Sequence, residues 1–289
     1  MKILVTGACG NIGSALVPRL LEEGFEVRGL DLPTEANRNV AGNQGRAEFV
    51  WGDVSDANTV RKAVNSDVDA VVHLAFVLPP VSEEKPALAK KVNVAGARNV
   101  LAAMKASIRK PKLVFSSTIS VFGITDKENP PIRPDHPVKG TDNYTRGKIL
   151  CEEMIRKSGV RYAILRLAVT LSPEIGSASM GYLFSLPLAG RVEFLHVQDA
   201  CTAIINSLKN KSSDNKTFII AGGKENQMTF KDLIRKTFGA LGLPDPDWSK
   251  FTKKPNYADW YDTTESQAVL RYQKRTVEDY VGELKKKLL

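Results

Sequence analysis

Residues 3–13 read Ile3-Leu4-Val5-Thr6-Gly7-Ala8-Cys9-Gly10-Asn11-Ile12-Gly13, and this stretch decides the fold. An apolar run of strand type ends at a glycine-rich turn, and a segment with helical spacing of apolar residues follows over residues 12–21. A strand that turns directly into a helix leaves free backbone N–H groups at the helix N-terminus. Those groups and the helix dipole favour a bound phosphate. The stretch therefore predicts a strand–turn–helix unit that holds the pyrophosphate of a dinucleotide.

The glycines and the next acidic residue indicate which dinucleotide binds. Gly7, Gly10 and Gly13 are spaced Gly-x-x-Gly-x-x-Gly, one residue longer in the first gap than the common fingerprint. We expect them to supply the tight turn, the close approach to the ligand and the helix–sheet packing. A second predicted strand, residues 26–30, ends at Asp31. Its carboxylate can accept hydrogen bonds from a ribose diol and would repel a 2′-phosphate, which favours NAD over NADP; a solvated strand-end residue is the alternative interpretation.

Strands and helices alternate through the first 170 residues. The strands are continuously apolar, which is typical of a parallel sheet that is covered by helices on both faces. The predicted fold class is therefore α/β, a Rossmann-type doubly wound parallel sheet. The predicted strands span residues 3–6, 26–30, 48–51, 70–75, 113–116 and 162–167, and the predicted helices span 12–21, 56–64, 86–104 and 142–157.

The alternation loosens from about Ser172. Helices are predicted over residues 199–208 and 229–238, with a strand over 217–220 between them. We expect a dinucleotide-binding domain of residues 1–171. Residues 172–289 are expected to form a small substrate lobe that is interleaved with the end of the sheet. Such a lobe would lie over the carboxyl ends of the strands, where ligands bind in these folds.

Composition and charge narrow the class of protein. The 289-residue chain has a formal net charge of +9, but the excess is diffuse and no aromatic stripe accompanies it, so we expect no nucleic-acid partner. The longest apolar stretch, residues 70–81, is too short to span a bilayer, and strand-like residues begin at Lys2, so no membrane association or leader is expected. The three cysteines, Cys9, Cys151 and Cys201, are widely separated, which favours a reducing, cytoplasmic location.

Tyr144 and Lys148 form the second informative motif. They lie four residues apart in a predicted helix and so share one face. A tyrosine with its ordinary pKa of about 10 is a poor base at neutral pH, but a nearby cation favours the phenolate. A tyrosine tuned in this way can take a proton from an alcohol or return one to a carbonyl. An incidental pair on a helix surface is the alternative when this motif is considered alone.

With these motifs in place, the chain resembles the extended short-chain dehydrogenase/reductases, the NAD-dependent epimerase/dehydratase family. The resemblance covers nearly the whole chain and is clearest over residues 1–170. It rests on the glycine loop 6–13, Asp53-Val54, His73-Leu74-Ala75, Asn93 in a segment similar to Asn-x-x-Gly-Thr-x-Asn, Ser116-Ser117-Thr118-Ile119-Ser120-Val121-Phe122-Gly123, Tyr144 with Lys148 and Glu152, and His196-Val197-Gln198-Asp199.

The resemblance implies a role for each matched residue. Tyr144 would be the general acid/base, Lys148 would lower its pKa and hold the nicotinamide ribose, and Thr118 would hydrogen-bond the reacting oxygen. It implies bound NAD, a small-molecule substrate and a homodimer, with Ala87, Leu88, Ile149 and Met154 as candidate interface residues. No metal site is expected, because His73 and His196 lack partners at ligand spacing. The implied cofactor contacts are Gly7, Gly10, Asn11, Ile12, Gly13, Asp31, Asp53, Val54, Leu74, Ala75, Asn93, Tyr144 and Lys148.

Three interpretations of the function stay open. An epimerase or dehydratase, such as a UDP-glucose 4-epimerase-like enzyme, would recycle its NAD, whereas a simple dehydrogenase or reductase would release it. A non-catalytic dinucleotide-sensing protein ranks last, because the catalytic residues are all present. Sugar-nucleotide members tend to carry an arginine where this chain has Val192, and residues 76–80 are apolar. Arg133, Arg166, Arg191 and Arg271 could bind a diphosphate only if the fold brings them to the pocket.

Overall fold

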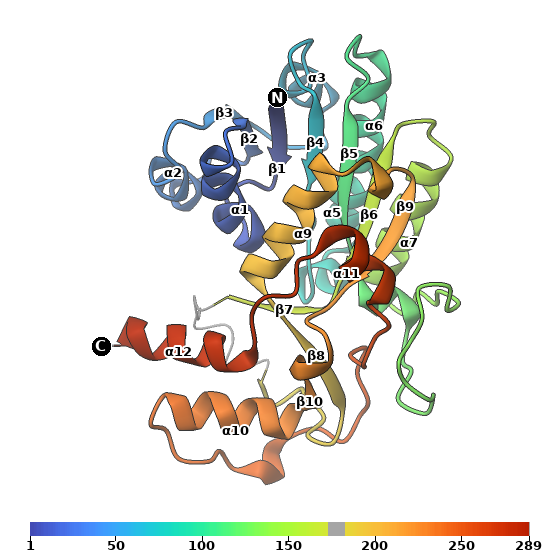
Figure 1. The fold of residues 1–289 in the computed structure, drawn as a ribbon. Coiled ribbons are helices and arrows are strands. Elements are labelled where there is room, and N and C mark those ends of the chain that lie inside the picture. Colours follow the sequence, from blue (N-terminus) through green and yellow to red (C-terminus); the bar gives the residue numbers. More distant parts are fainter. Residues whose placement is uncertain (173–182, 289) are drawn as a thin grey trace.

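A seven-stranded parallel sheet forms the centre of the molecule (Figure 1). The computed structural model describes residues 1–172 and 183–288. The strands follow the order β3-β2-β1-β4-β5-β6-β9, so the chain reverses direction across the sheet between β1 and β4. This order confirms the predicted doubly wound fold. The strands are β1 (Lys2–Thr6), β2 (Glu26–Asp31), β3 (Glu48–Trp51), β4 (Ala70–His73), β5 (Lys112–Thr118), β6 (Tyr162–Leu167) and β9 (Lys216–Ile220).

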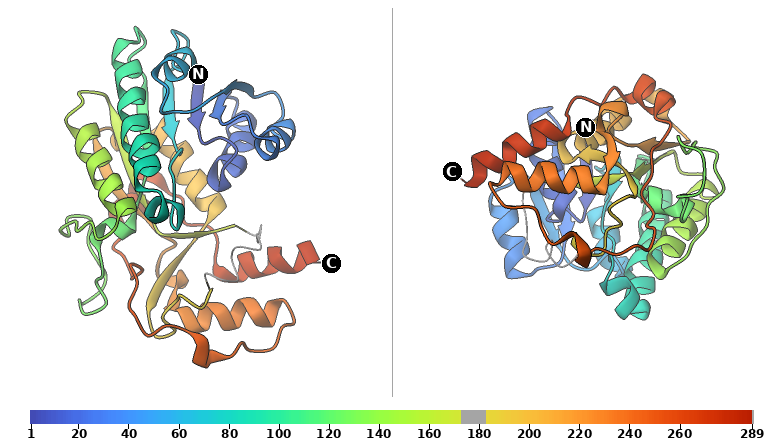
Figure 2. Two further views of the ribbon diagram at one scale, coloured as in Figure 1. Left: turned by 180° about the vertical axis from the view of Figure 1, so that it is seen from behind. Right: turned by 90° about the horizontal axis from the view of Figure 1, so that it is seen from below.

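Helices cover both faces of this sheet, as the apolar strands require. On one face α1 (Asn11–Glu22) packs beside α9 (Val197–Lys209), and Leu16 and Leu20 of α1 are fully buried there. On the other face lie α3 (Ala57–Ala63), α6 (Gly96–Ala106) and α7 (Asn143–Arg156), which are in front in the left view of Figure 2. The remaining helices of this part are α2 (Glu35–Gly42), α4 (Val81–Glu84), α5 (Pro86–Ala89) and α11 (Thr264–Leu270).

The helix that was predicted over residues 86–104 is not regular. It begins with α5, continues through a π-helical segment, η1 (Lys90–Ala95), and ends as α6. Buried Asn93 lies within η1, and its side-chain amide binds the backbone of Val77 through both its oxygen and its nitrogen. Single π-helical turns inside α-helices occur frequently at functional sites. The spacing of apolar residues along the helix does not predict this widened turn. The hydrogen bonds of Asn93 that accompany the turn go to Val77, 16 residues earlier in the chain.

A smaller lobe lies below the carboxyl ends of the central strands (Figures 1 and 2). Its three-stranded sheet has the order β10-β8-β7, and α10 and α12 pack against it around a separate apolar cluster. The chain enters the lobe as β7 and β8, returns to the central sheet as β9, and re-enters the lobe as β10. The lobe elements are β7 (Val169–Leu171), β8 (Arg191–His196), β10 (Gln227–Thr229), α10 (Phe230–Ala240) and α12 (Val277–Leu288).

Several elements were not predicted from the sequence: α2, α4, α11, α12 and the three strands of the lobe. Lys285 and Lys286 belong to α12 and are exposed. Buried Val277, Tyr280 and Leu284 supply the apolar face of that helix, so its periodicity was present in the sequence. In the described part of the chain, no helix combines the length and apolar character that a bilayer crossing needs.

One buried ion pair anchors α7 to the sheet. Arg166 of β6 donates to Glu152 of α7 through Nε, at 3.0 Å, and through Nη2, at 2.8 Å, and both side chains are almost fully buried. Ser117 of β5 adds a hydrogen bond of 2.6 Å to the same carboxylate. The glutamate that follows the Tyr–Lys motif in sequence therefore holds the helix that carries the motif.

We predict that Glu152→Gln destabilises the fold by about 3–5 kcal/mol, because removing one charge of a buried pair leaves the other uncompensated. Urea unfolding followed by circular dichroism measures this loss. Glu153→Gln, one residue along and exposed, is the matched control and should stay within about 0.5 kcal/mol of the parent. Equal stabilities for the two variants would contradict the anchoring role.

Candidate functional site

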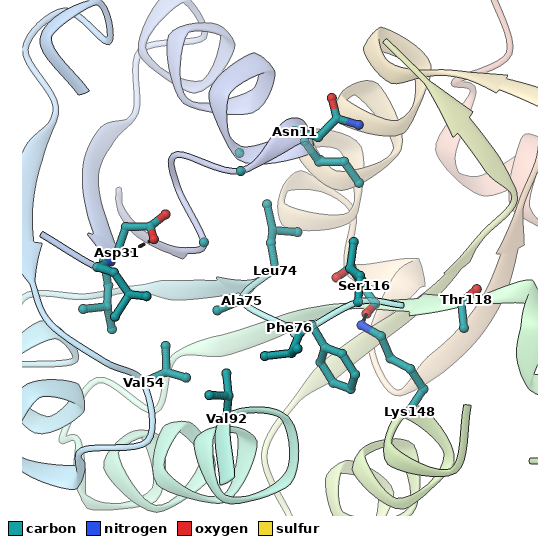
Figure 3. Close-up of a pocket in the computed structure, with 18 of the residues that line it drawn as sticks. Asn11, Asp31, Val54, Leu74, Ala75, Phe76, Val92, Ser116, Thr118 and Lys148 are labelled. Atoms are coloured by element: carbon teal, nitrogen blue, oxygen red, sulfur yellow. Dashed lines mark hydrogen bonds between the residues drawn. The ribbon is translucent and has the colours of Figure 1, made fainter. Parts of the chain in front are cut away.

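A cavity of about 600 Å³ opens at the carboxyl ends of the central strands, where the strand order reverses. Figure 3 shows Asp31 at one side of it and Thr118 and Lys148 at the other, with Leu74, Ala75 and Phe76 between them. The structure brings almost all of the sequence-predicted site residues to this one cavity. Its lining includes Gly7, Gly10, Asn11, Ile12, Gly13, Asp31, Asp53, Val54, Leu74, Ala75, Thr118, Tyr144 and Lys148.

The turn between β1 and α1 forms the glycine end of the cavity. Gly7 adopts a φ of +71°, and a Cβ atom there would lie 2.8 Å from the backbone nitrogen of Ala75. Only glycine accepts both that backbone conformation and that approach. Helix α1 begins after Gly10 without a capping side chain, and its first turn contains no acidic residue. This arrangement suits an anionic group at the helix N-terminus.

Asp31 is held in one orientation at the end of β2. Its Oδ2 accepts a hydrogen bond of 2.8 Å from the Cys9 backbone, and its Oδ1 accepts from Leu32 N and Asn37 Nδ2. Burial and the Asp31 charge raise the pKa of the neighbouring Cys9 thiol to about 11. Cys9 therefore stays protonated at neutral pH, which agrees with a small space-filling residue in the turn.

The wall between the glycine turn and the Tyr144 end comes from β3 and β4. Asn99 of α6 donates to the carbonyl oxygens of Val54 and Ser55, at 3.1 and 3.0 Å, and so fixes the segment that carries Asp53 and Val54. Asn93 lies differently from the other predicted residues, because it does not line the cavity. Its side chain instead holds the backbone of Val77, at 2.6 and 3.1 Å, and thereby the loop after β4.

Lys148 projects from α7 into the cavity beneath Phe76. Its Nζ donates to the Ser116 carbonyl oxygen at 2.6 Å and lies 3.7 Å from the centroid of the Phe76 ring. The Tyr144 ring is farther away, at 5.9 Å from the same nitrogen. Burial lowers the pKa of Lys148 to about 7, because an ammonium group loses hydration in this apolar surrounding.

The pKa of Tyr144 differs from the sequence expectation. Burial raises it to about 12, and the hydrogen bond with Thr118 opposes that rise only in part. The expectation that Lys148 lowers this pKa is not met in the structure, because the ammonium group is directed toward Ser116 and Phe76. Tyr144 is therefore a protonated phenol at neutral pH.

Two residues that shape this end of the cavity were missed by the sequence analysis. Phe76 packs edge-on against Tyr144, with ring centroids 5.7 Å apart. Glu83 of α4 accepts hydrogen bonds from the backbone nitrogens of Asn143 and Tyr144, at 3.0 and 3.1 Å. It therefore holds the first turn of α7 and the backbone of Tyr144. Glu83 and Asn143 are 60 residues apart in the chain, so no local sequence pattern predicts this contact.

The two histidines that were considered as metal ligands have other partners. Nδ1 of His73 lies 2.6 Å from the Thr6 hydroxyl, and burial lowers the pKa of this imidazole to about 3. Nδ1 of His196 accepts from Gln198 N at the start of α9. Within residues 1–172 and 183–288, no three His, Cys, Asp or Glu side chains are grouped to hold a metal ion.

We predict that Lys148→Met changes the pH dependence of stability. The folded-state pKa, about 7, lies below the ordinary value of 10.5, so burying the ammonium group costs stability below pH 7. That cost disappears as the pH rises from 7 to 10.5. Urea unfolding at pH 6, 7, 8 and 9 should show the variant's relative stability falling with pH above 7. The exposed Lys157→Met is the control and should show a constant difference, and the same constancy for Lys148→Met would refute the prediction.

Comparisons with known proteins agree with this geometry. The chain is 35% identical over 172 residues to a UDP-glucose 4-epimerase of Lactobacillus helveticus, an alignment that covers 57% of this chain and 51% of that protein. An uncharacterized protein of Mycobacterium bovis is 27% identical over 267 residues, which cover 84% of this chain and 67% of that one. The chain thus spans about half the length of the first of these relatives.

Solved structures share the fold. A UDP-glucose-4-epimerase from Stenotrophomonas maltophila, with bound NAD and formylated UDP-arabinopyranose, has a TM-score of 0.84 at 21% identity, covering 99% of this chain and 97% of that one. A UDP-glucuronic acid 4-epimerase from Bacillus cereus, in complex with UDP-glucuronic acid and NAD, has a TM-score of 0.81 at 22% identity over the full length of both chains.

A family model extends over most of the chain and includes every predicted site residue. The model of the NAD dependent epimerase/dehydratase family matches residues 3–221. That range runs from the first strand through the central sheet, the glycine turn, Thr118, Tyr144 and Lys148 to the end of β9. The chain belongs to the NAD dependent epimerase/dehydratase family.

Proposed function

We propose that this protein is an NAD-dependent enzyme that transfers hydride at a carbinol or carbonyl carbon of a small-molecule substrate. One observation carries the proposal: a single cavity joins a glycine turn and a strand-end carboxylate to Thr118, Tyr144 and Lys148. A dinucleotide is long enough to need both ends of such a cavity, and the proton-transfer groups lie only at one of them. Family membership supports the same activity.

The residues present fit NAD. The Cβ-free approach at Gly7 and the uncapped start of α1 suit a pyrophosphate, and Asp31 suits the diol of the adenosine ribose. The Asp31 carboxylate would repel a 2′-phosphate, so NAD is favoured over NADP. When bound, NAD supplies a hydride acceptor and its reduced form supplies a donor. The residues that would hold it are Gly7, Gly10, Asn11, Ile12, Gly13, Asp31, Asp53, Val54, Leu74, Ala75, Tyr144 and Lys148, with Asn93 acting through the Val77 loop.

The side chains at the Tyr144 end divide the proton transfer between them. With a pKa of about 12, the phenol of Tyr144 is protonated at neutral pH and can donate to a developing alkoxide. In the reverse direction it must first lose that proton. Lys148 is the one Lys or Arg in the described cavity lining, and its ammonium group would favour the phenolate if it turned from Ser116 toward Tyr144. Thr118, which lines the same end of the cavity as Tyr144, would orient the reacting oxygen.

Two chemical outcomes share this site. An epimerase or dehydratase would oxidise its substrate transiently and recycle the NAD, whereas a dehydrogenase or reductase would release the cofactor with the product. The sequence relatives named as UDP-glucose 4-epimerases support the first outcome. A non-catalytic sensing protein is disfavoured, because Thr118, Tyr144 and Lys148 are all placed at the cavity. The three cysteines are free, which supports a reducing, cytoplasmic setting.

We further propose a homodimer in which α5, η1 and α7 pair with their copies around a two-fold axis. Ile149 and Met154 pack against core clusters and Leu88 lines the main cavity, so these three are weaker interface candidates than they were from the sequence. Ala87 and Leu150 are exposed beside a second cavity of about 310 Å³ between these helices. Light scattering at micromolar concentration should give twice the chain mass, and Leu150→Glu should halve it. A monomeric parent would exclude the dimer.

The main test of the function is Tyr144→Phe. We expect this variant to bind NAD about as tightly as the parent, since only the phenolic hydroxyl is lost. Turnover should fall by about 10²–10⁴-fold, the usual contribution of a general acid–base group. Calorimetric titration with NAD and NADP measures binding, with NADP expected to bind more weakly. An unaffected turnover number would place the acid–base group elsewhere, and absence of NAD binding by the parent would reject the function.

A further inference from the structure

We propose that the substrate is an uncharged secondary alcohol or ketone with an apolar body, and that the site does not bind a nucleoside diphosphate. This inference rests on the proposed function, and it names the substrate of that same site. It follows from where the cations of the chain are, which groups already occupy them, and what lines the wall beside Tyr144.

The cavity offers almost no positive charge. Lys148 is the one Lys or Arg in its described lining, and Asp31 and Asp53 supply two negative charges. The Nζ of Lys148 already donates to Ser116 and lies under the Phe76 ring. A dinucleotide pyrophosphate can bind the N-terminus of α1 instead. A second diphosphate in the same cavity would need charge-assisted donors of its own, and the described lining has none left to provide them.

Two arginines that could have supplied those donors form ion pairs within the protein instead. Arg166 forms the buried pair with Glu152 that anchors α7. Arg191, at the start of β8, binds the fully buried Asp259 through Nε and Nη2, at 2.5 and 2.9 Å. The Nη2 atom of Arg191 also donates to the Glu128 carbonyl oxygen at 3.0 Å. Releasing Arg191 toward a ligand would leave the buried Asp259 carboxylate without its cation, which is strongly unfavourable. Releasing Arg166 would leave buried Glu152 with Arg156 alone, whose side chain is 37% exposed, and would remove two of its hydrogen bonds.

The other two candidate arginines and the β7–β8 connection do not supply a cation to the cavity either. Arg133 is exposed and faces Asp135 at 3.5 Å, and Arg271 ends α11 in the left-handed conformation; neither lines the cavity. Residues 172–190 contain no Lys, Arg or His in their sequence. That connection therefore cannot contribute a cationic side chain, whatever its position.

The wall beside Tyr144 is apolar instead. Phe76, Val77 and Leu78 follow one another after β4 and all line the cavity. The loop is fixed against α7, because Phe76 packs on Tyr144 and Glu83 binds the Tyr144 backbone. Leu78 is 55% exposed although it lines a cavity, so covering it with a ligand would remove apolar surface from water. A few polar groups that fix orientation, set in an apolar wall, are typical of small-molecule sites.

The experiment compares a homologous series from propan-2-ol to octan-2-ol with NAD, and the matching ketones with NADH, by absorbance at 340 nm. Calorimetry first establishes that the parent binds NAD. UDP and UDP-glucose are then titrated into the NAD-loaded protein. We expect kcat/KM to rise about fourfold for each added methylene that reaches the wall. We expect no heat of binding from UDP or UDP-glucose at millimolar concentration.

Two variants locate the effect in the cavity. Leu78→Ser should flatten the dependence on chain length while NAD affinity stays unchanged. Leu32→Ser replaces a similarly exposed leucine beside Asp31 and should leave the chain-length dependence intact. Micromolar binding of UDP-glucose, rates that do not depend on chain length, or absence of turnover across both series in a protein that binds NAD would overturn the inference. Failure to bind NAD would instead reject the proposed function itself.

Discussion

The close approach of the β1–α1 turn to the end of β4 is the constraint on which the rest of the site depends. It exists because Gly7 has no Cβ atom and adopts a φ of +71°, so that the turn can lie against Ala75. A side chain there would push α1 away from the sheet and would close the glycine end of the cavity. The strand order reverses between β1 and β4, so the same contact also sets the position of the cavity in the fold.

Near the site, the arginine side chains form structural ion pairs and do not face the cavity. Arg166 and Arg191 are paired with buried carboxylates, Glu152 and Asp259, and these pairs hold α7 and the lobe in place. What is left beside Tyr144 is a protonated phenol, a lysine with a lowered pKa and the apolar loop after β4. Glu83 connects that loop to the first turn of α7. The position of Tyr144 therefore depends on contacts from several elements that are distant in sequence.

The positions of some site residues could be predicted from the sequence, and those of others could not. Asp31 could be placed at the cavity because the end of a strand beside a glycine turn is a position defined by chain order alone. Lys148 could be placed on the same face as Tyr144 from its helical spacing, but its direction toward Ser116 could not, because that carbonyl oxygen belongs to a strand 32 residues earlier. Asn93 was assigned to the cofactor by resemblance, whereas its amide is used by Val77. The lobe strands β7 and β10, of three residues each, carry too short a pattern to be predicted, whereas β8 has six residues and was missed despite its apolar run.

The sequence by itself determined the parallel sheet, the glycine turn, the acidic strand end and the pairing of Tyr144 with Lys148 on one helix, because each of these is encoded within a few consecutive residues. Only the tertiary structure decided that Arg166 and Arg191 are occupied, that Glu83 holds the backbone of Tyr144, and that Phe76 covers the Lys148 ammonium group. The physical reason is that burial, ion pairing and the pKa shifts that follow depend on neighbours contributed by distant segments, which no local pattern specifies.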